Sequence, residues 1–146
     1  MKAVIQRVSK ASVTIDNIEK RETGKGIVVL LAVSLDDTEE QSRWMAEKIL
    51  NLRIFSNHNN EFDRSVTDVK GDVLVISQFT LYGNCMKGRR PDFVQSASAE
   101  IAKPLYNKFV EYLRQSSVVK VVTGEFQSHM LIEIHNDGPV TFIIEK

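Results

Sequence analysis

The chain has 146 residues, which is the usual size of one compact domain. Hydrophobic residues make up 42% and charged residues 26%, so there is enough apolar material for a core, which argues against intrinsic disorder. Lys and Arg together number 19, as do Asp and Glu, so the formal net charge is zero. This balance argues against a protein that coats nucleic acid through bulk charge, and any RNA binding would need a local basic patch.

No segment has the character of a targeting or membrane-spanning sequence. The first residues alternate apolar and polar side chains, unlike a signal peptide, and the longest apolar stretch, 27–33, is far too short to span a bilayer. Cys85 is the single cysteine, so no internal disulfide can form and a reducing compartment is expected. We therefore expect one domain over residues 1–146, in the cytoplasm and without a membrane partner.

The first third of the chain has the alternation of strands. Residues 3–8 and 11–16 each place apolar side chains on one face and polar side chains on the other. Residues 20–23 are polar and predict an edge strand, whereas 27–33 is apolar throughout, as is typical of a strand buried on both faces.

A helix is expected after this buried strand. Thr38 and Gln41 have the spacing of a capping box, in which each side chain satisfies one free backbone N–H group. Met45, Ile49 and Leu52 then follow at helical spacing and predict a face directed toward the core.

The second half of the chain predicts more strands and a second helix. Residues 56–60 form a polar loop, 73–76 a buried strand and 83–98 an irregular segment. The second helix is expected to begin close to Pro104, because proline is tolerated in the first turn of a helix. Three closing strands are expected over 118–122, 130–136 and 140–144. This order favours an α+β fold with mixed or antiparallel, barrel-like sheets and two main helices.

The common catalytic and metal-binding motifs are absent. The sequence has no Walker loop and no GxGxxG, HExxH or GxSxG motif. His58 falls in a polar loop, and His129 and His135 are separated by about 20 Å along one predicted strand, too far to share a metal ion. Cys85 matches no thiol-protease or redox signature. We predict neither a metal nor an organic cofactor.

Ser77-Gln78-Phe79-Thr80-Leu81 follows the buried strand 73–76 directly. It places hydroxyl, amide and backbone N–H groups at the end of a rigid element, where a small polar ligand can be held. From this segment alone, the simpler explanation is a polar strand end that satisfies its own backbone groups.

The segment 136–141 reads Asn-Asp-Gly-Pro-Val-Thr and lies between two predicted strands. Its composition is that of a plain hairpin turn. A Gly-Pro bond has a further capacity, because the cis isomer before proline costs only about 0.5–1 kcal/mol. A cis bond would turn successive carbonyl groups to one side of the chain, where they could measure a ligand without any side chain.

These two segments, 77–81 and 136–141, resemble the two signature motifs of D-aminoacyl-tRNA deacylases. Residues 3–8, 48–55 and 87–91 are also similar to the family at corresponding positions, and the length agrees. The resemblance therefore covers essentially the whole chain, and it implies a homodimer with the active site at the subunit interface.

The resemblance also implies roles for particular residues. Gln78 and Thr80 would be the catalytic positions, and Ser77 and Phe79 would line the pocket for the terminal adenosine and its aminoacyl ester. Met130, early in a closing strand, matches another pocket position.

Three further positions follow from the same resemblance. Gly138 and Pro139, joined by a cis bond, would come from the second subunit and face the amino acid, and Arg7 would hold this dipeptide in place. The basic run with Lys87, Arg89 and Arg90 would contact phosphates of the acceptor stem, although a solvated surface run explains it almost as well.

The implied reaction is hydrolysis of D-aminoacyl-tRNA to a free D-amino acid and tRNA, a form of chiral proofreading. The substrate is an activated ester, so a positioned water and N–H donors to the oxyanion, each worth about 2.7–4 kcal/mol, would suffice. Thr80 has no adjacent base, so it is expected to act as a ligand, with the 2′-hydroxyl of the tRNA assisting. L side chains would clash with the Gly138-Pro139 carbonyls, whereas glycine would pass, so mischarged glycyl-tRNA(Ala) would also be cleared.

Two alternatives stay open. One is a related deacylase for mischarged L-alanyl-tRNA, and the other is a catalytically silent nucleic-acid-binding dimer of the same fold. The sequence departs from the family pattern at Arg64, at residues 83–86 and at residues 127–129. These departures bear on the rim of the pocket and on substrate preference, not on the reaction.

Overall fold

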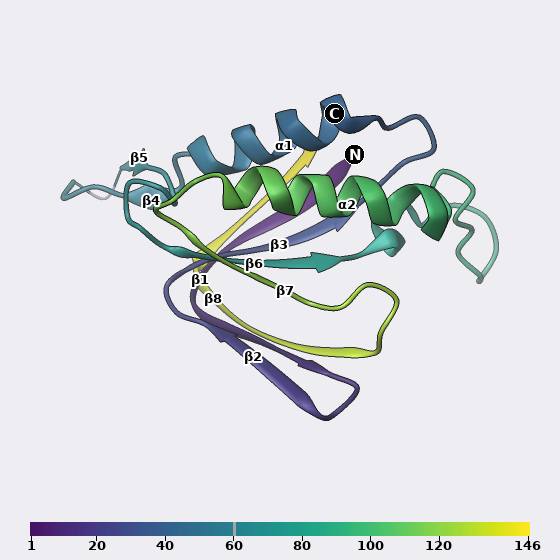
Figure 1. The fold of residues 1–146 in the computed structure, drawn as a ribbon, viewed down its shortest axis with the longest axis horizontal. Helices are drawn as coiled ribbons and strands as arrows, with labels where there is room; N and C mark the ends of the chain where they lie inside the picture. Colours follow the sequence, from purple (N-terminus) through teal and green to yellow (C-terminus); the bar gives the residue numbers. More distant parts are fainter. Residues whose placement is uncertain (60) are drawn as a thin grey trace.

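Two helices lie side by side on one face of a strongly curved mixed sheet (Figure 1). This computed structural model describes residues 1–59 and 61–146. The elements in that part of the chain are β1 (Lys2–Ile15), β2 (Glu19–Thr23), β3 (Gly26–Ala32), α1 (Glu39–Asn51), β4 (Phe55–Ser56), β5 (Phe62–Arg64), β6 (Asp72–Ser77), the 3-10 helix η1 (Phe79–Tyr82), α2 (Ala99–Arg114), β7 (Lys120–Thr123) and β8 (Met130–Glu145). Within it, no helix is long and apolar enough to cross a membrane.

The strand β1 organises the sheet because it pairs with three others. Its residues 2–8 pair with β3, its residues 11–15 pair with β2, and β8 runs antiparallel along the opposite edge. Beyond β3 the order continues to β6 and β7, both parallel to their neighbours. The curvature brings β2 back toward β7, where Arg21 Nη1 donates to the carbonyl oxygen of Thr123 at 2.7 Å. The sheet is therefore nearly closed into a barrel, and the expected α+β fold class is confirmed.

Alternate residues of the buried strands supply two separate cores. Ile27 and Val29 of β3 face the helices, where Phe109 of α2 is fully buried among them. Val28 of the same strand faces the barrel interior together with Leu74 of β6. A strand that is buried on both faces reads as a continuous apolar run, which is why 27–33 showed no alternation.

The first helix begins as expected and the second does not. Thr38 and Gln41 form the complete capping box at the start of α1, and Met45 and Ile49 are fully buried. The expectation that the second helix begins near Pro104 is wrong, because α2 begins at Ala99 and contains the proline in its second turn. Pro104 is exposed there, so the carbonyl that loses its N–H partner faces water.

Both long strands were expected as separate pieces. Residues 3–8 and 11–16 belong to one strand, β1, with register shifts on either side of Val8. Residues 130–136 and 140–144 also belong to one strand, β8, so the hairpin-turn interpretation of 136–141 is wrong.

Two smaller differences concern short strands. The first closing strand covers Lys120–Thr123, slightly later than the expected 118–122. The expected polar loop at 56–60 begins inside a short hairpin of β4 and β5, and its last residue, Asn60, lies outside the described residues. Arg64, one of the departures from the family pattern, donates two hydrogen bonds to Ser56 O in this hairpin.

Candidate active site

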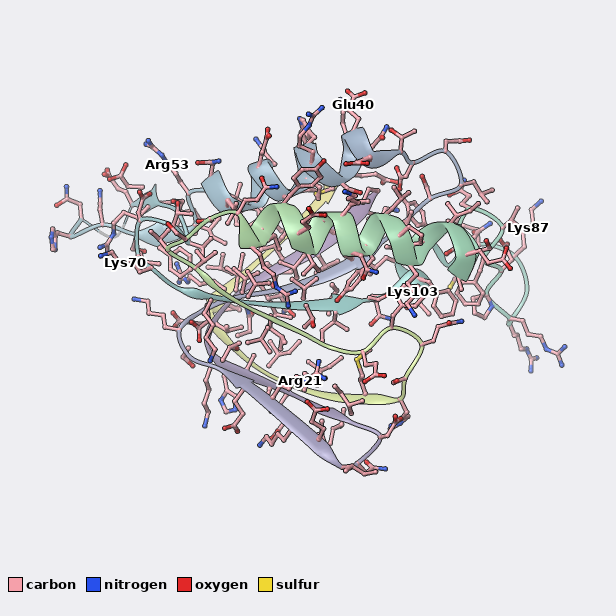
Figure 2. The ribbon with its side chains drawn as sticks, in the orientation of Figure 1. Arg21, Glu40, Arg53, Lys70, Lys87 and Lys103 are labelled. Atoms are coloured by element: carbon pink, nitrogen blue, oxygen red, sulfur yellow. The ribbon has the colours of Figure 1, made fainter. Side chains whose placement is uncertain are left out.

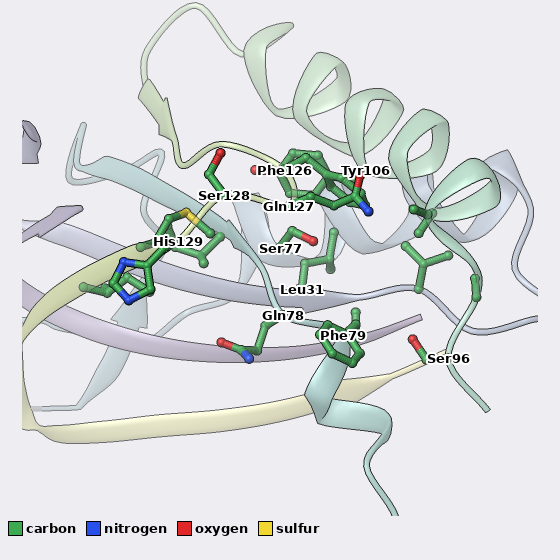
Figure 3. Close-up of a pocket in the computed structure, with 18 residues that line it drawn as sticks. Leu31, Ser77, Gln78, Phe79, Ser96, Tyr106, Phe126, Gln127, Ser128 and His129 are labelled. Atoms are coloured by element: carbon green, nitrogen blue, oxygen red, sulfur yellow. The ribbon is translucent and has the colours of Figure 1, made fainter. Parts of the chain in front are cut away.

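A cavity of about 540 Å³ opens between the end of β6, the first turns of α2 and the connection from β7 to β8. Figure 3 shows Ser77, Gln78 and Phe79 on one side of this cavity, with Tyr106 and Phe126 across from them. Three residues that the sequence predicted as site residues therefore line one pocket. We call this cavity the adenosine pocket, after the ligand that we propose for it below.

The end of β6 is held rigidly where the chain enters the pocket. The backbone N–H of Gln78 donates to Leu31 O at 2.7 Å, so the chain stays attached to β3 one residue beyond the strand. The 3-10 helix η1 then turns the backbone away, and the Phe79 side chain is left 55% exposed at the mouth. Polar groups at the end of a buried strand thus become the floor of a cavity.

Thr80 does not itself line the cavity, but it is connected to a residue that does. Its Oγ1 accepts a hydrogen bond from Gln78 Nε2, and its side chain is exposed. Met130, the first residue of β8, lines the pocket as expected. The structure thus places Gln78, Thr80 and Met130 together, while their chemical roles stay predictions.

The aromatic wall of the pocket was not foreseen. The rings of Tyr106 and Phe126 lie 5.9 Å apart, and Tyr106 OH donates to Val75 O at 3.1 Å. Burial raises the pKa of the Tyr106 phenol, so this group stays neutral and remains a hydrogen-bond donor. Tyr106 lies three residues before Phe109 on the buried face of α2, a spacing that would have revealed it, whereas Phe126 has no such signal.

The rim of the pocket is formed by Gln127, Ser128 and His129, which depart from the family pattern. Gln127 has a φ of 67°, in the left-handed region that non-glycine residues seldom adopt. The backbone of His129 is fixed to Asp16 by hydrogen bonds of 2.9 and 3.2 Å. Within the described residues, no three His, Cys, Asp or Glu side chains gather closely enough to hold a metal ion, and metal independence stays a prediction.

Gly138 and Pro139 lie in a loop that protrudes from β8. Asn136 pairs with Val8 and Thr141 pairs with Gln6, so residues 137–140 bulge outward opposite a single residue of β1. The Gly138-Pro139 peptide bond is cis, and Gly138 has a φ of 124°. The loop is therefore an excursion within one strand.

Arg7 and Asn136 hold the base of this loop. Arg7 Nε donates to Asp137 O at 3.2 Å, and Arg7 Nη1 donates to Ile54 O at 2.8 Å. Asn136 Nδ2 donates to the carbonyl oxygens of Arg7 and Val140, each at 3.0 Å. The expected contact between Arg7 and the Gly138-Pro139 segment is thus present within one chain.

The loop and the adenosine pocket are separate in this chain. Neither Gly138 nor Pro139 lines the pocket. Gln78 is bonded to Leu31, which pairs with Ala3, and Arg7 lies four residues further along β1, about 13 Å away. The two signature segments therefore do not meet within a single chain.

The basic run lies on an exposed loop beside the pocket. Lys87, Arg89 and Arg90 are exposed, do not line the cavity, and take part in no ion pair within the described part of the chain (Figure 2). The loop returns to the pocket at Phe93, whose ring lies 5.0 Å from that of Phe79. Its position stays compatible with a contact to RNA.

Comparison with known proteins gives a consistent result. Residues 4–145 match the family model described as D-Tyr-tRNA(Tyr) deacylase. The chain is 50% identical to a protein of Petrotoga mobilis and 51% identical to one of Fervidobacterium nodosum, both named D-aminoacyl-tRNA deacylase. Each comparison covers 100% of this chain and 97% of the relative.

Two solved structures share the fold. One, titled c-Myc DNA Unwinding Element Binding Protein, has a TM-score of 0.90 and 42% identity, covering 100% of this chain and 99% of the other. The second, titled as a probable eukaryotic D-amino acid tRNA deacylase, has a TM-score of 0.88 and 20% identity, covering 98% and 97%. The match of sequence and fold over the whole length leads to one conclusion: this chain belongs to the D-Tyr-tRNA(Tyr) deacylase family.

Proposed function

We propose that the protein hydrolyses the ester bond of D-aminoacyl-tRNA and releases a free D-amino acid and tRNA. The observation that carries this proposal is the cavity that Ser77, Gln78 and Phe79 line, in a chain that is half identical to proteins named D-aminoacyl-tRNA deacylase. Because tRNA is charged in the cytoplasm, the protein would act there as a proofreading enzyme.

The adenosine pocket suits the uncharged end of an aminoacyl-tRNA. Its lining within the described residues contains no Asp, Glu, Lys or Arg side chain. Phe79 is half exposed at the mouth and offers an aromatic face on which a base can stack. The terminal adenosine and its ester, which carry no phosphate beyond the linking one, would therefore fill this cavity.

The chemistry would depend on positioning and not on an acid–base pair. The side-chain partner of Thr80 is the amide of Gln78, which donates to Oγ1 and cannot accept a proton as a base would. The hydroxyl proton of Thr80 is thereby directed elsewhere, toward a bound ligand. Thr80 would thus contribute its hydroxyl or backbone N–H to the ester or its oxyanion, while water attacks with help from the 2′-hydroxyl of the tRNA.

A second copy of the chain would complete the site. The Gly138 loop is exposed and is surrounded by apolar side chains that a single chain leaves in water, among them Phe62 at 52% and Ile143 at 70% exposure. The Phe62 ring also contacts that of Phe142 at 6.3 Å. Such a patch on the outermost strand suits an interface with a symmetric second copy.

In this homodimer the loop of one subunit would face the pocket of the other. Gly138 and Pro139 offer only backbone acceptors, which would bind the α-amino group and leave no space for an L side chain. A D side chain would point to solvent, and glycine would pass, which predicts clearance of glycyl-tRNA(Ala). Lys87, Arg89 and Arg90 would contact phosphates of the acceptor stem.

The test is single-turnover deacylation of D-Tyr-tRNA and L-Tyr-tRNA at equal enzyme concentration with a metal chelator present. We expect rapid loss of the D ester while the L ester survives. A protein that is folded, dimeric and bound to tRNA but hydrolyses neither ester would contradict the proposal. Loss of activity only in the chelator would contradict a metal-independent reaction.

A second candidate is a nucleic-acid-binding dimer that has lost hydrolysis. It is favoured by the 42% identity with the structure titled as a DNA unwinding element binding protein. This alternative predicts a stoichiometric complex with uncharged RNA and no turnover of either ester in the same assay.

A further inference from the structure

A second cavity, of about 520 Å³, lies beneath α2 and is adjacent to the adenosine pocket. Tyr106 and Phe126 line both cavities, so this pair of rings forms the wall between them. The second cavity is also lined by Arg21 of β2 and by Lys103 and Arg114 of α2. We call it the basic groove. It is a different surface from the exposed loop that carries Lys87.

The cations of the groove sit on rigid elements. Arg21 Nη1 donates to Thr123 O at 2.7 Å, and Arg21 Nε donates to Glu19 Oε1 at 2.6 Å. Figure 2 shows Lys103 on the side of α2 that faces the β7–β8 connection, with Arg21 on β2 below it. The guanidinium of Arg21 is therefore held in place before any ligand binds.

Lys103 and Arg114 mark out the length of the groove. They lie about three turns apart on one face of α2, which separates them by roughly 16 Å along the helix axis. Neither takes part in an ion pair within the described part of the chain. A row of this length can follow successive phosphates of one nucleic-acid strand.

Carboxylates also line the groove, and they do not cancel these two cations. Glu111 is paired with Lys108 at 3.2 Å. Glu125 lies close enough to Arg21 to raise the pKa of the guanidinium, as does the hydrogen bond from Glu19, the larger cause. Lys103 and Arg114 thus remain as the positive charge that a ligand would meet.

We propose that the basic groove binds the phosphodiester backbone of the RNA strand whose 3′ end enters the adenosine pocket. This inference rests on the proposed function. The lining changes from uncharged to cationic at the wall of Tyr106 and Phe126. The ligand changes in the same way, from an uncharged aminoacyl nucleoside to a chain of phosphates.

The experiment measures binding of uncharged tRNA by fluorescence anisotropy over a series of salt concentrations. The test variant is the double substitution Lys103→Gln and Arg114→Gln, and the matched control is Lys25→Gln and Lys48→Gln. All four side chains are exposed, so both variants are expected to fold. We expect the groove variant to bind about tenfold more weakly and to lose about 0.7 from the slope of log K against log salt for each lost single-strand contact.

Two outcomes overturn the inference: binding by the groove variant that equals that of the native chain, or an equal loss in the control variant. A second substrate, the D-tyrosyl ester of free adenosine, has no phosphodiester and separates the inference from the proposed function. We expect the preference of the groove variant for the tRNA ester over the adenosine ester to fall about tenfold, in line with the binding loss. A native chain that hydrolyses neither ester would contradict the proposed function, while the binding comparison would still decide the role of the groove.

Discussion

The segments 77–81 and 136–141 carry the two signatures of the family, and the structure uses them in opposite ways. The first follows a buried strand and turns its side chains into a cavity. The second interrupts the outermost strand and exposes a glycine and a proline that offer only backbone groups. The comparison teaches that one chain can supply the pocket for a nucleoside while the group that would recognise the amino acid points away from that pocket.

The two segments also differ in what holds them. Gln78 is attached by its backbone to β3, so the pocket depends on the sheet itself. The Gly138 loop depends on two side chains, Arg7 and Asn136, which bind its backbone from outside. Changes at the loop should therefore act on geometry and selectivity, whereas changes at the pocket should act on contacts with the substrate.

The largest effect is expected for Gly138→Ala. An added Cβ would lie 2.8 Å from both Arg7 Nη2 and Val140 Cγ2, at a φ of 124° that L side chains rarely adopt. The loop must shift, and a displacement of about 1 Å at a reacting centre can cost about 100-fold in rate. We expect a loss of this size in single-turnover deacylation of D-Tyr-tRNA, or a relaxed D-over-L preference. Unchanged activity and selectivity would exclude the loop from substrate recognition, and Gly88→Ala, on the exposed basic loop, serves as control.

A smaller loss is expected for Arg7→Ala. The substitution removes the hydrogen bonds to Asp137 O and Ile54 O that position the loop. We expect kcat to fall about tenfold, the equivalent of about 1.4 kcal/mol, with little change in KM for the tRNA. Arg7→Lys should restore part of the rate, since one donor can still reach a carbonyl. A change in KM alone would indicate that Arg7 contacts the RNA instead.

Thr80→Ala probes the pocket side of the comparison. If Thr80 acts as a ligand, the rate should fall no more than about tenfold, as for one neutral hydrogen bond of about 1 kcal/mol. Thr80→Ser, which keeps the hydroxyl, provides the control. Complete loss of deacylation in a folded Thr80→Ala protein would favour a covalent role, and a search for an acyl-enzyme by mass spectrometry would then decide.

The smallest effect is expected at the pocket rim. Gln127 has a φ of 67°, which costs a non-glycine residue on the order of 1 kcal/mol, so Gln127→Gly should relieve strain. We expect the melting temperature in calorimetry to rise by about 2–4 °C. Gln127→Ala retains the strain and provides the control. A lower melting temperature for the glycine variant would show that the side chain stabilises the rim by more than its backbone costs.

Much of the fold was encoded locally. The alternation within β1, the apolar run of β3 and the capping box at Thr38 each depend on neighbours in the sequence, and all three are found in the structure. The segments 77–81 and 136–141 were likewise identified from their own residues. Gly138 and Pro139 were correctly expected in a cis bond next to Arg7.

Other features depended on contacts between distant parts of the chain. The continuity of β8 through residues 137–140 comes from pairing with β1 on both sides of the bulge, more than a hundred residues away in sequence. The start of α2 at Ala99 became possible because Pro104 faces solvent, which no local pattern reveals.

The composition of the site divides in the same way. The sequence by itself determined which residues have the chemistry for a ligand, because side-chain type and spacing are local properties. Only the tertiary structure decided that Tyr106 and Phe126 form the wall between two cavities and that the Gly138 loop stands apart from Gln78. Long-range strand pairing and helix packing set these distances, and neither leaves a periodic signal in the chain.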